Sequence, residues 1–113
     1  MWKVCSYVLL LITVLVGLVS CSDRRAELMA RQLPEGMREA FMEYYDYPGY
    51  KAFAVAFDDL DGPYAFASWY NASREFSAKG NAILQCKKYL RNQPGIESQC
   101  RLFAFGNEMV IRE

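Results

Sequence analysis

Hydrophobic and polar positions follow two different periods between residues 34 and 57. In the first stretch the apolar residues recur at i, i+3, i+4, i+7 and i+8: Met37, Ala40, Phe41, Tyr44 and Tyr45. This spacing predicts a helix over 34–45, which Pro34 begins and the sequence Asp46-Tyr47-Pro48-Gly49 ends. From 52 to 57 large and small residues alternate, which predicts a strand with Phe53, Val55 and Phe57 on one face and Ala52, Ala54 and Ala56 on the other.

Three more elements follow the turn at 58–63. An aromatic-rich run over 64–70 predicts a second strand, antiparallel to the first. Ser73 is a candidate cap for a helix reaching about Leu90. The apolar arc of that helix holds Ala78, Ala82, Cys86 and Tyr89, flanked by Phe76, Ile83 and Leu90, with Lys79 inside the arc. Two further strands are expected at 100–105 and 108–112, joined by Gly106-Asn107.

The order of these elements predicts the fold class. We expect an α+β domain over 34–113, with a four-stranded, mainly antiparallel sheet in strand-strand-helix-strand-strand order and an additional N-terminal helix. The sequence leaves the order of the strands in the sheet open.

The first 21 residues have the pattern of a secretory leader. Lys3 precedes an apolar run that ends near Leu18, about 11 residues long and too short to span a bilayer as a helix. The next residues, Leu18-Val19-Ser20-Cys21, resemble the lipobox of bacterial lipoproteins. The resemblance implies that 1–20 is a signal peptide, that cleavage falls between Ser20 and Cys21, and that Cys21 carries a diacylglyceryl group and usually a further acyl chain. The alternative is an uncleaved anchor helix with an incidental cysteine.

This resemblance also implies a location. A lipoprotein belongs to the bacterial envelope, and in enteric-type bacteria an aspartate directly after the lipid-bearing cysteine favours the inner membrane. Ser22 occupies that position and Asp23 follows it. We therefore expect the outer membrane, with the protein facing the periplasm, the lipid as its membrane contact, and 21–33 as a polar tether that is partly helical.

Charge and cysteine content narrow the classes of function. Removing residues 1–20 from the 113-residue chain leaves 93, with 12 basic and 13 acidic residues, so nothing favours nucleic-acid binding. Cys5 leaves with the leader and Cys21 takes the lipid, so Cys86 and Cys100 remain in a compartment that permits disulfides. They form one bridge or stay as two buried thiols.

Three stretches resemble a short two-cysteine module of secreted and lipid-anchored proteobacterial proteins. They are Lys51-Ala52-Phe53-Ala54-Val55, the helix pattern Ala78-x3-Ala82-Ile83-x2-Cys86, and Cys100-Arg101-Leu102-Phe103-Ala104. The resemblance covers about Leu33 to Ile111 and implies the Cys86–Cys100 bridge, but no activity. It fails at Tyr64-Ala65-Phe66-Ala67, where the module has glycine and tryptophan.

Candidate chemistry is sparse. The chain contains no histidine, which removes histidine triads and histidine metal sites, and it has no phosphate-binding glycine loop. Asp58, Asp59 and Asp61 beside Gly62 suggest a calcium loop, but the ligand spacing is wrong and a solvated turn is the better interpretation. No catalytic residue, cofactor or metal is indicated.

We therefore expect a non-catalytic lipoprotein that acts through an envelope protein partner or as a structural module. The alternative is a small glycan- or peptidoglycan-binding module that stacks sugars on an aromatic face. The candidate aromatic residues are Tyr44, Tyr45, Tyr47, Tyr50, Tyr64, Phe66, Trp69 and Tyr70.

Overall fold

The computed structural model describes residues 21–110, which form three helices and four strands. In chain order these are α1 (Cys21–Ala30), α2 (Glu35–Tyr45), β1 (Tyr50–Phe57), β2 (Tyr64–Ala72), α3 (Glu75–Arg91), β3 (Arg101–Phe105) and β4 (Glu108–Met109). The predicted α+β class and the order of elements along the chain are confirmed. The predicted signal peptide, its cleavage residue Ser20 and the side chain of Cys21 lie outside the described residues.

The sheet has the strand order β2-β1-β3-β4, and each neighbouring pair is antiparallel. β1 is central because it pairs with β2 on one side and with β3 on the other. Ala54, for example, lies between Ala67 of β2 and Leu102 of β3. Both predicted hairpins form, and Gly106 turns the second one with a positive φ of 61°, a conformation that a residue without Cβ adopts readily.

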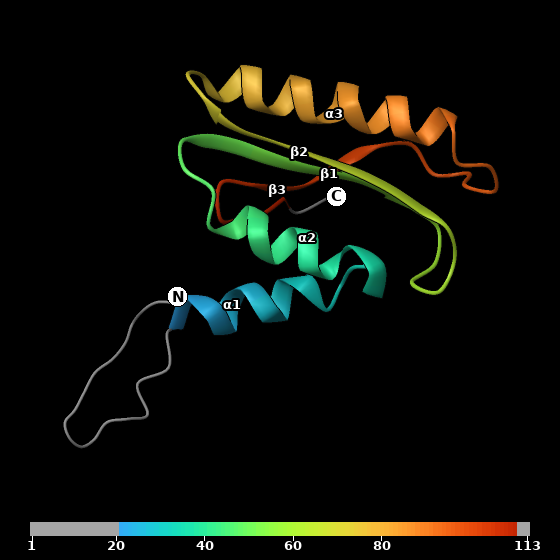
Figure 1. Ribbon diagram of the computed structural model, residues 1–113, viewed down its shortest axis with the longest axis horizontal. Coiled ribbons are helices and arrows are strands. Elements are labelled where there is room, and N and C mark those ends of the chain that lie inside the picture. The colour runs from blue at the N-terminus through green and yellow to red at the C-terminus, as the bar shows by residue number, and fades with distance from the viewer. Residues whose placement is uncertain (1–20, 111–113) are drawn as a thin grey trace.

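Helices cover both faces of the sheet, with α3 on one face and α2 on the other, and α1 packs on the far side of α2 (Figure 1). The alternation of large and small residues in β1 explains this arrangement. Phe53 and Val55 belong to the core under α2, whereas Ala52 and Ala54 belong to the core under α3. The prediction that one face of β1 carries large side chains and the other carries alanines is confirmed.

The core between the sheet and α2 is built around aromatic rings. Phe41 is fully buried, and its ring meets Phe53 and Phe103 edge-on at centroid distances of 5.2 and 5.4 Å. Edge-to-face packing of this kind is favoured by the ring quadrupoles. The apolar side predicted for α2 therefore packs against the face of the sheet that carries the large side chains.

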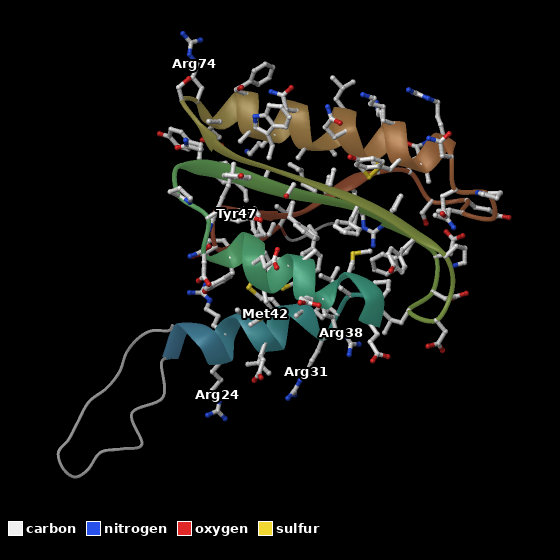
Figure 2. All side chains as sticks on the ribbon, viewed as in Figure 1. Arg24, Arg31, Arg38, Met42, Tyr47 and Arg74 are labelled. Carbon is white, nitrogen blue, oxygen red and sulfur yellow. A yellow bond between two sulfur atoms is a disulfide. The ribbon has the colours of Figure 1, made fainter. Side chains whose placement is uncertain are left out.

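Residues 21–33 were expected as a polar tether, and the structure corrects this in one respect. α1 is a regular helix, and Ala26, Met29, Ala30 and Leu33 are buried in the same core as Phe41. Arg24 of α1 and Arg31, the residue after its end, are exposed and point away from the sheet (Figure 2). A few small or flexible apolar residues are sufficient because α1 packs mainly against α2 and meets the sheet at its short edge strand β4, where Arg25 pairs with Glu108 at 3.0 Å. The packed domain thus begins before residue 34.

The face under α3 uses small side chains. Ala78, Ala82 and Cys86 are fully buried against the alanines of β1, so the helix approaches the sheet closely. Expectations about the cap of this helix and about Phe76 are wrong. Arg74, not Ser73, is its N-cap, and it makes no side-chain capping bond. Phe76 is 85% exposed, because it lies too far round the helix to reach the sheet.

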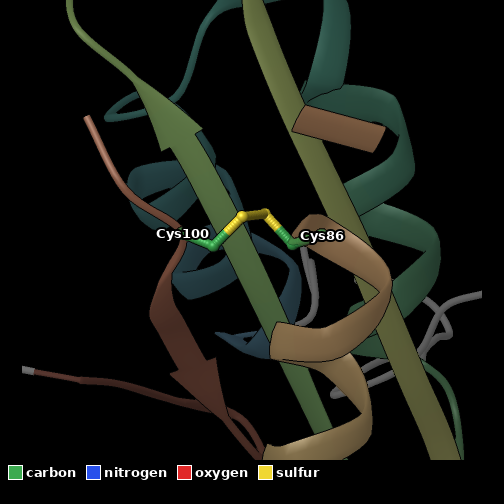
Figure 3. The surroundings of a disulfide bond; sticks show 2 residues. All are labelled: Cys86 and Cys100. Atoms are coloured by element: carbon green, nitrogen blue, oxygen red, sulfur yellow. A yellow bond between two sulfur atoms is a disulfide. The ribbon is translucent and has the colours of Figure 1, made fainter. Parts of the chain in front are cut away.

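A disulfide joins Cys86 of α3 to Cys100, the residue before β3 (Figure 3). The two Cα atoms are 6.1 Å apart, within the usual range for such bonds. The bridge ties the C-terminal half of α3 to the sheet across the Gln93-Pro94-Gly95 break, so the expected Cys86–Cys100 pair is confirmed.

Gly49, between α2 and β1, occupies a position that other residues disfavour. Its φ is +76°, and a Cβ there would lie 2.8 Å from the Cα of Asn71. The chain crosses the end of β2 at this point, where the amide of Asn71 donates to the carbonyl of Pro48 at 2.9 Å. Glycine is therefore required by both backbone conformation and space.

Candidate functional site

A groove of about 690 Å³ runs between the edge strand β2 and helix α3. Six consecutive residues of β2, Tyr64 to Trp69, line one wall. Their side chains alternate between the two faces of the sheet, so a groove that all six line must follow the strand edge and not one face. The other wall comes from Gln85 and Tyr89 of α3 and from Asn92 and Gln93 at its end.

The helix wall follows from the helical repeat. Gln85, Tyr89 and Asn92 are spaced i, i+4 and i+7, so they share one side of α3. That side adjoins the buried stripe of Ala82 and Cys86 but extends past the outer edge of the sheet. Tyr89 was expected in the apolar arc, and it is instead 55% exposed in the groove wall. The ten lining residues are all uncharged near neutral pH, and three of them carry a side-chain carboxamide.

The eight aromatic residues proposed as a sugar platform do not gather on one exposed face. Tyr44 and Tyr45 are buried in the core. Tyr64 and Phe66 are half-buried and pack against that core. Tyr47 and Tyr70 lie against each other, with ring centroids 4.0 Å apart, and burial together with the charge of Glu43 raises the pKa of Tyr47. Among the eight, Tyr64, Phe66 and Trp69 line the groove.

The acidic turn is a structural clamp for the segment before β3. The carboxylate of Asp58 accepts hydrogen bonds from the amide of Glu97 at 2.8 Å and from the amide and hydroxyl of Ser98 at 2.9 and 2.5 Å. These bonds lower the pKa of Asp58 below its usual value. Asp59 and Asp61 are exposed. Within residues 21–110 no group of three or more acidic, histidine or cysteine side chains is placed to hold a metal ion.

Lys51 is the one charged residue that the structure buries among the described residues, with 4% of its surface exposed. Its amine donates to the carbonyls of Tyr44 and Tyr45 at 3.1 and 2.7 Å, and so satisfies the C-terminal end of α2. The amine also lies 4.9 Å from the centre of the Tyr44 ring. Burial lowers the pKa of Lys51 from 10.5 to about 8, partly offset by the negative charge of Asp46.

Of the residues in the predicted lipobox, the structure describes only the backbone of Cys21, the first residue of α1. Any group attached to Cys21 would join the folded body through helix and not through a loose linker, since Ala26 is already buried one and a half turns later. Among residues 21–110 the helices are all too short or too polar to cross a membrane.

Sequence reasoning missed the groove and the two structural polar residues. Gln85, Asn92 and Gln93 line a groove only because β2 stands at the edge of the sheet. The sequence did not determine the order of the strands in the sheet. A lone lysine between a helix end and a buried strand is a signal that would have indicated the role of Lys51.

Compared with known proteins, this chain matches no family model, no curated protein and no solved structure. The resemblances to lipoprotein leaders and to the two-cysteine module stay predictions, and the function is argued from the residues and the geometry.

Proposed function

We propose that this chain is a lipid-anchored protein of the bacterial envelope that binds another envelope protein and performs no catalysis. The observation that carries the proposal is the sequence Leu18-Val19-Ser20-Cys21 behind a short apolar run and a single Lys3. A leader of this kind directs secretion, and two or three acyl chains at Cys21 would hold the protein firmly at a membrane. Ser22 directly after Cys21 favours the outer membrane, facing the periplasm.

The start of α1 at Cys21 supports a close approach to that membrane. Because Met29 and Ala30 are buried, α1 has little freedom to swing away from the domain. A lipid at its first residue would hold the domain directly at the membrane surface. The exposed Arg24 of α1 and Arg31, the residue after its end, would then meet the lipid headgroups or the periplasm.

The chemistry of the described residues supports binding more than catalysis. Cys86 and Cys100 are joined, so neither supplies a thiolate. The amine with the strongly lowered pKa, that of Lys51, is buried and directed at two backbone carbonyls. The groove between β2 and α3 offers amide, hydroxyl and aromatic groups, which recognise a ligand but do not activate one.

A second candidate function, glycan binding, has one observation in its favour. Trp69 and Tyr89 line the same groove from opposite walls, and aromatic rings of this kind stack on sugar faces. The two candidates separate cleanly in a sedimentation assay with purified peptidoglycan sacculi. Retention of the wild-type chain but not of Trp69→Ala would support the glycan function. The protein-binding function predicts no retention of either.

The anchor is tested by membrane fractionation with a matched cysteine control. Cys21→Ala should leave the membrane fraction or accumulate uncleaved, whereas Cys5→Ala, in the leader, should behave as wild type. Ser22→Asp should move the protein from the outer to the inner membrane. A Cys21→Ala variant that is cleaved and sorted normally would contradict the proposal.

A further inference from the structure

Between Tyr64 and Trp69 the outer edge of β2 has none of the features by which proteins usually block strand pairing, and the bulge in its pairing with β1 lies beyond Trp69, near Ala72. β2 is nine residues long and stands at the edge of the sheet, so alternate N–H and C=O groups along it face away from β1. Natural edges are protected by lysine, proline, bulges or a covering element. The sequence of β2, Tyr64-Ala-Phe-Ala-Ser-Trp-Tyr-Asn-Ala72, contains neither a charge nor a proline. The register with β1 is regular from Tyr64 to Trp69.

The groove beside this edge is long enough for one additional strand. Six consecutive residues of β2 line it, and six strand residues span about 20 Å. The free main-chain groups of the edge favour an extended segment over a helix, because the backbone groups of a helix are already hydrogen-bonded within it.

The walls match the chemistry of a peptide backbone. The open edge of β2 supplies main-chain donors and acceptors, and the carboxamides of Gln85, Asn92 and Gln93 supply both kinds of group from the helix side. Because the walls carry no charge, they would desolvate an uncharged stretch of chain at less cost than an ionic ligand. Alanines 65 and 67 leave room for side chains that point toward α3.

Charges around the groove favour a different protein over a second copy of this chain. α3 carries four basic residues, Lys79, Lys87, Lys88 and Arg91, against one acidic residue, Glu75. Pairing of β2 with β2 of a second copy would place two such helices side by side, with like charges opposed. Lys88 is exposed and lies three positions after Gln85, on the groove side of α3. It therefore favours a partner with acidic side chains beside the paired stretch.

We propose that the groove binds an extended segment of another protein, which adds to the sheet as a fifth strand along β2 under α3. The segment is uncharged over about five residues and carries acidic residues next to them. Backbone hydrogen bonds to β2 hold it, as in other cases of strand addition, and Lys88 pairs with its acidic flank. This inference rests on the proposed protein-binding function and names its site and the chemistry of its partner.

The test uses a displayed library of random twelve-residue peptides, selected against the full chain purified from membranes in detergent. We expect selected peptides with an uncharged, strand-forming centre and an acidic flank. Binding should slow amide exchange in residues 64–69 and leave exchange in β4 unchanged. N-methyl groups can be placed on either of the two alternating sets of central amides of a selected peptide. Only one set faces β2, so methylation of that set should weaken binding at least about tenfold, and methylation of the other set should not.

Two pairs of matched variants locate the site. Gln85→Trp places a large side chain in the groove and should weaken binding at least about tenfold. Leu84→Trp, at a neighbouring position that is 57% exposed and does not line the groove, should have no effect. Lys88→Glu should weaken binding of acidic-flanked peptides by about three- to tenfold at low salt, and Lys87→Glu should not. Circular dichroism of each variant confirms that it is folded.

Three outcomes would overturn the inference. The first is a selection that yields no peptide protecting residues 64–69. The second is equal loss of binding in Gln85→Trp and Leu84→Trp. The third is a dimer in detergent that Gln85→Trp abolishes, since a second copy would then occupy the groove. None of these three outcomes bears on the proposed lipid anchor at Cys21. Conversely, a Cys21→Ala variant that is cleaved and sorted normally would refute the proposed function without bearing on peptide binding.

Discussion

The disulfide between Cys86 and Cys100 should make a large contribution to the free energy of unfolding. The sequence separation is 14, so the bond closes a ring of 15 residues. On the chain-entropy model such a ring stabilises by about 3 kcal/mol, because it restricts the unfolded chain. Cys86 is fully buried among the alanines under α3, so the suitable replacement is alanine. Serine would add the cost of burying a hydroxyl group, about 1–3 kcal/mol.

The double variant Cys86→Ala/Cys100→Ala should therefore melt about 12–24 °C below the oxidised wild type, at about 4–8 °C per kcal/mol for a domain of this size. The assay is thermal unfolding followed by circular dichroism, with and without reductant, and Cys21 is kept in both proteins. Reductant should lower the melting temperature of the wild type toward that of the variant and leave the variant unchanged. A variant within about 3 °C of the oxidised wild type would refute the chain-entropy argument for this loop.

Three further predictions concern the glycines and the two structural polar residues. Gly49→Ala should lower the free energy of unfolding by about 1–2 kcal/mol or more, because Gly49 has a positive φ. Gly80→Ala should raise it by about 0.5–1 kcal/mol, because Gly80 lies in the exposed face of α3 with no atom near the position of a Cβ. Urea unfolding measures both changes. The pKa of Lys51 falls from 10.5 in the unfolded chain to about 8 in the folded one, so the unfolded state binds more protons between these values. Stability should accordingly rise with pH through the lower part of that window, and Lys51→Met should abolish the rise. Asp58→Asn should speed amide exchange at Glu97 without changing exchange in β1, because it weakens the acceptor of that amide.

The pH measurement has a natural upper limit. Burial raises the pKa of Tyr44 above its usual value, and its hydroxyl donates to the carbonyl of Gly106 at 2.7 Å. Above about pH 10 the unfolded chain therefore loses a tyrosine proton that the folded chain keeps, and stability falls. A rise followed by a fall is the expected shape. A flat profile between about pH 8 and 9.5 would contradict the lowered pKa of Lys51.

Local patterns were sufficient for the elements and for the two faces of the sheet. The alternation of Phe53 and Val55 with alanines has the strand period of two, and each set meets a helix of suitable bulk. The disulfide could also be predicted, because only two cysteines remain once the predicted leader and the predicted lipid site are set aside. These features depend on neighbours in sequence or on simple elimination.

The groove could not be predicted, because it depends on which strand lies at the edge of the sheet. β1 pairs with β3 across about 50 residues of chain, and nothing in the local sequence requires β3 rather than β4 to lie beside it. The packing of α1 was missed because Arg24, Arg25 and Glu27 make the segment look like a solvated one, and of its side chains described from Arg24 on, those buried are Ala26, Met29 and Ala30. The exposed positions of Phe76 and Tyr89 show that an apolar residue near a helix arc need not reach the core.

The central claim is that the mature protein begins with a lipid-bearing Cys21, and mass spectrometry of the N-terminal peptide tests it most directly. The peptide should be isolated by proteolysis of the chain from the membrane fraction. We expect its first residue to be Cys21, with a diacylglyceryl group on the sulfur and a further acyl chain on the amino group in bacteria that add one. An unmodified Cys21, or a chain that still carries residues 1–20 or begins at another position, would contradict the claim.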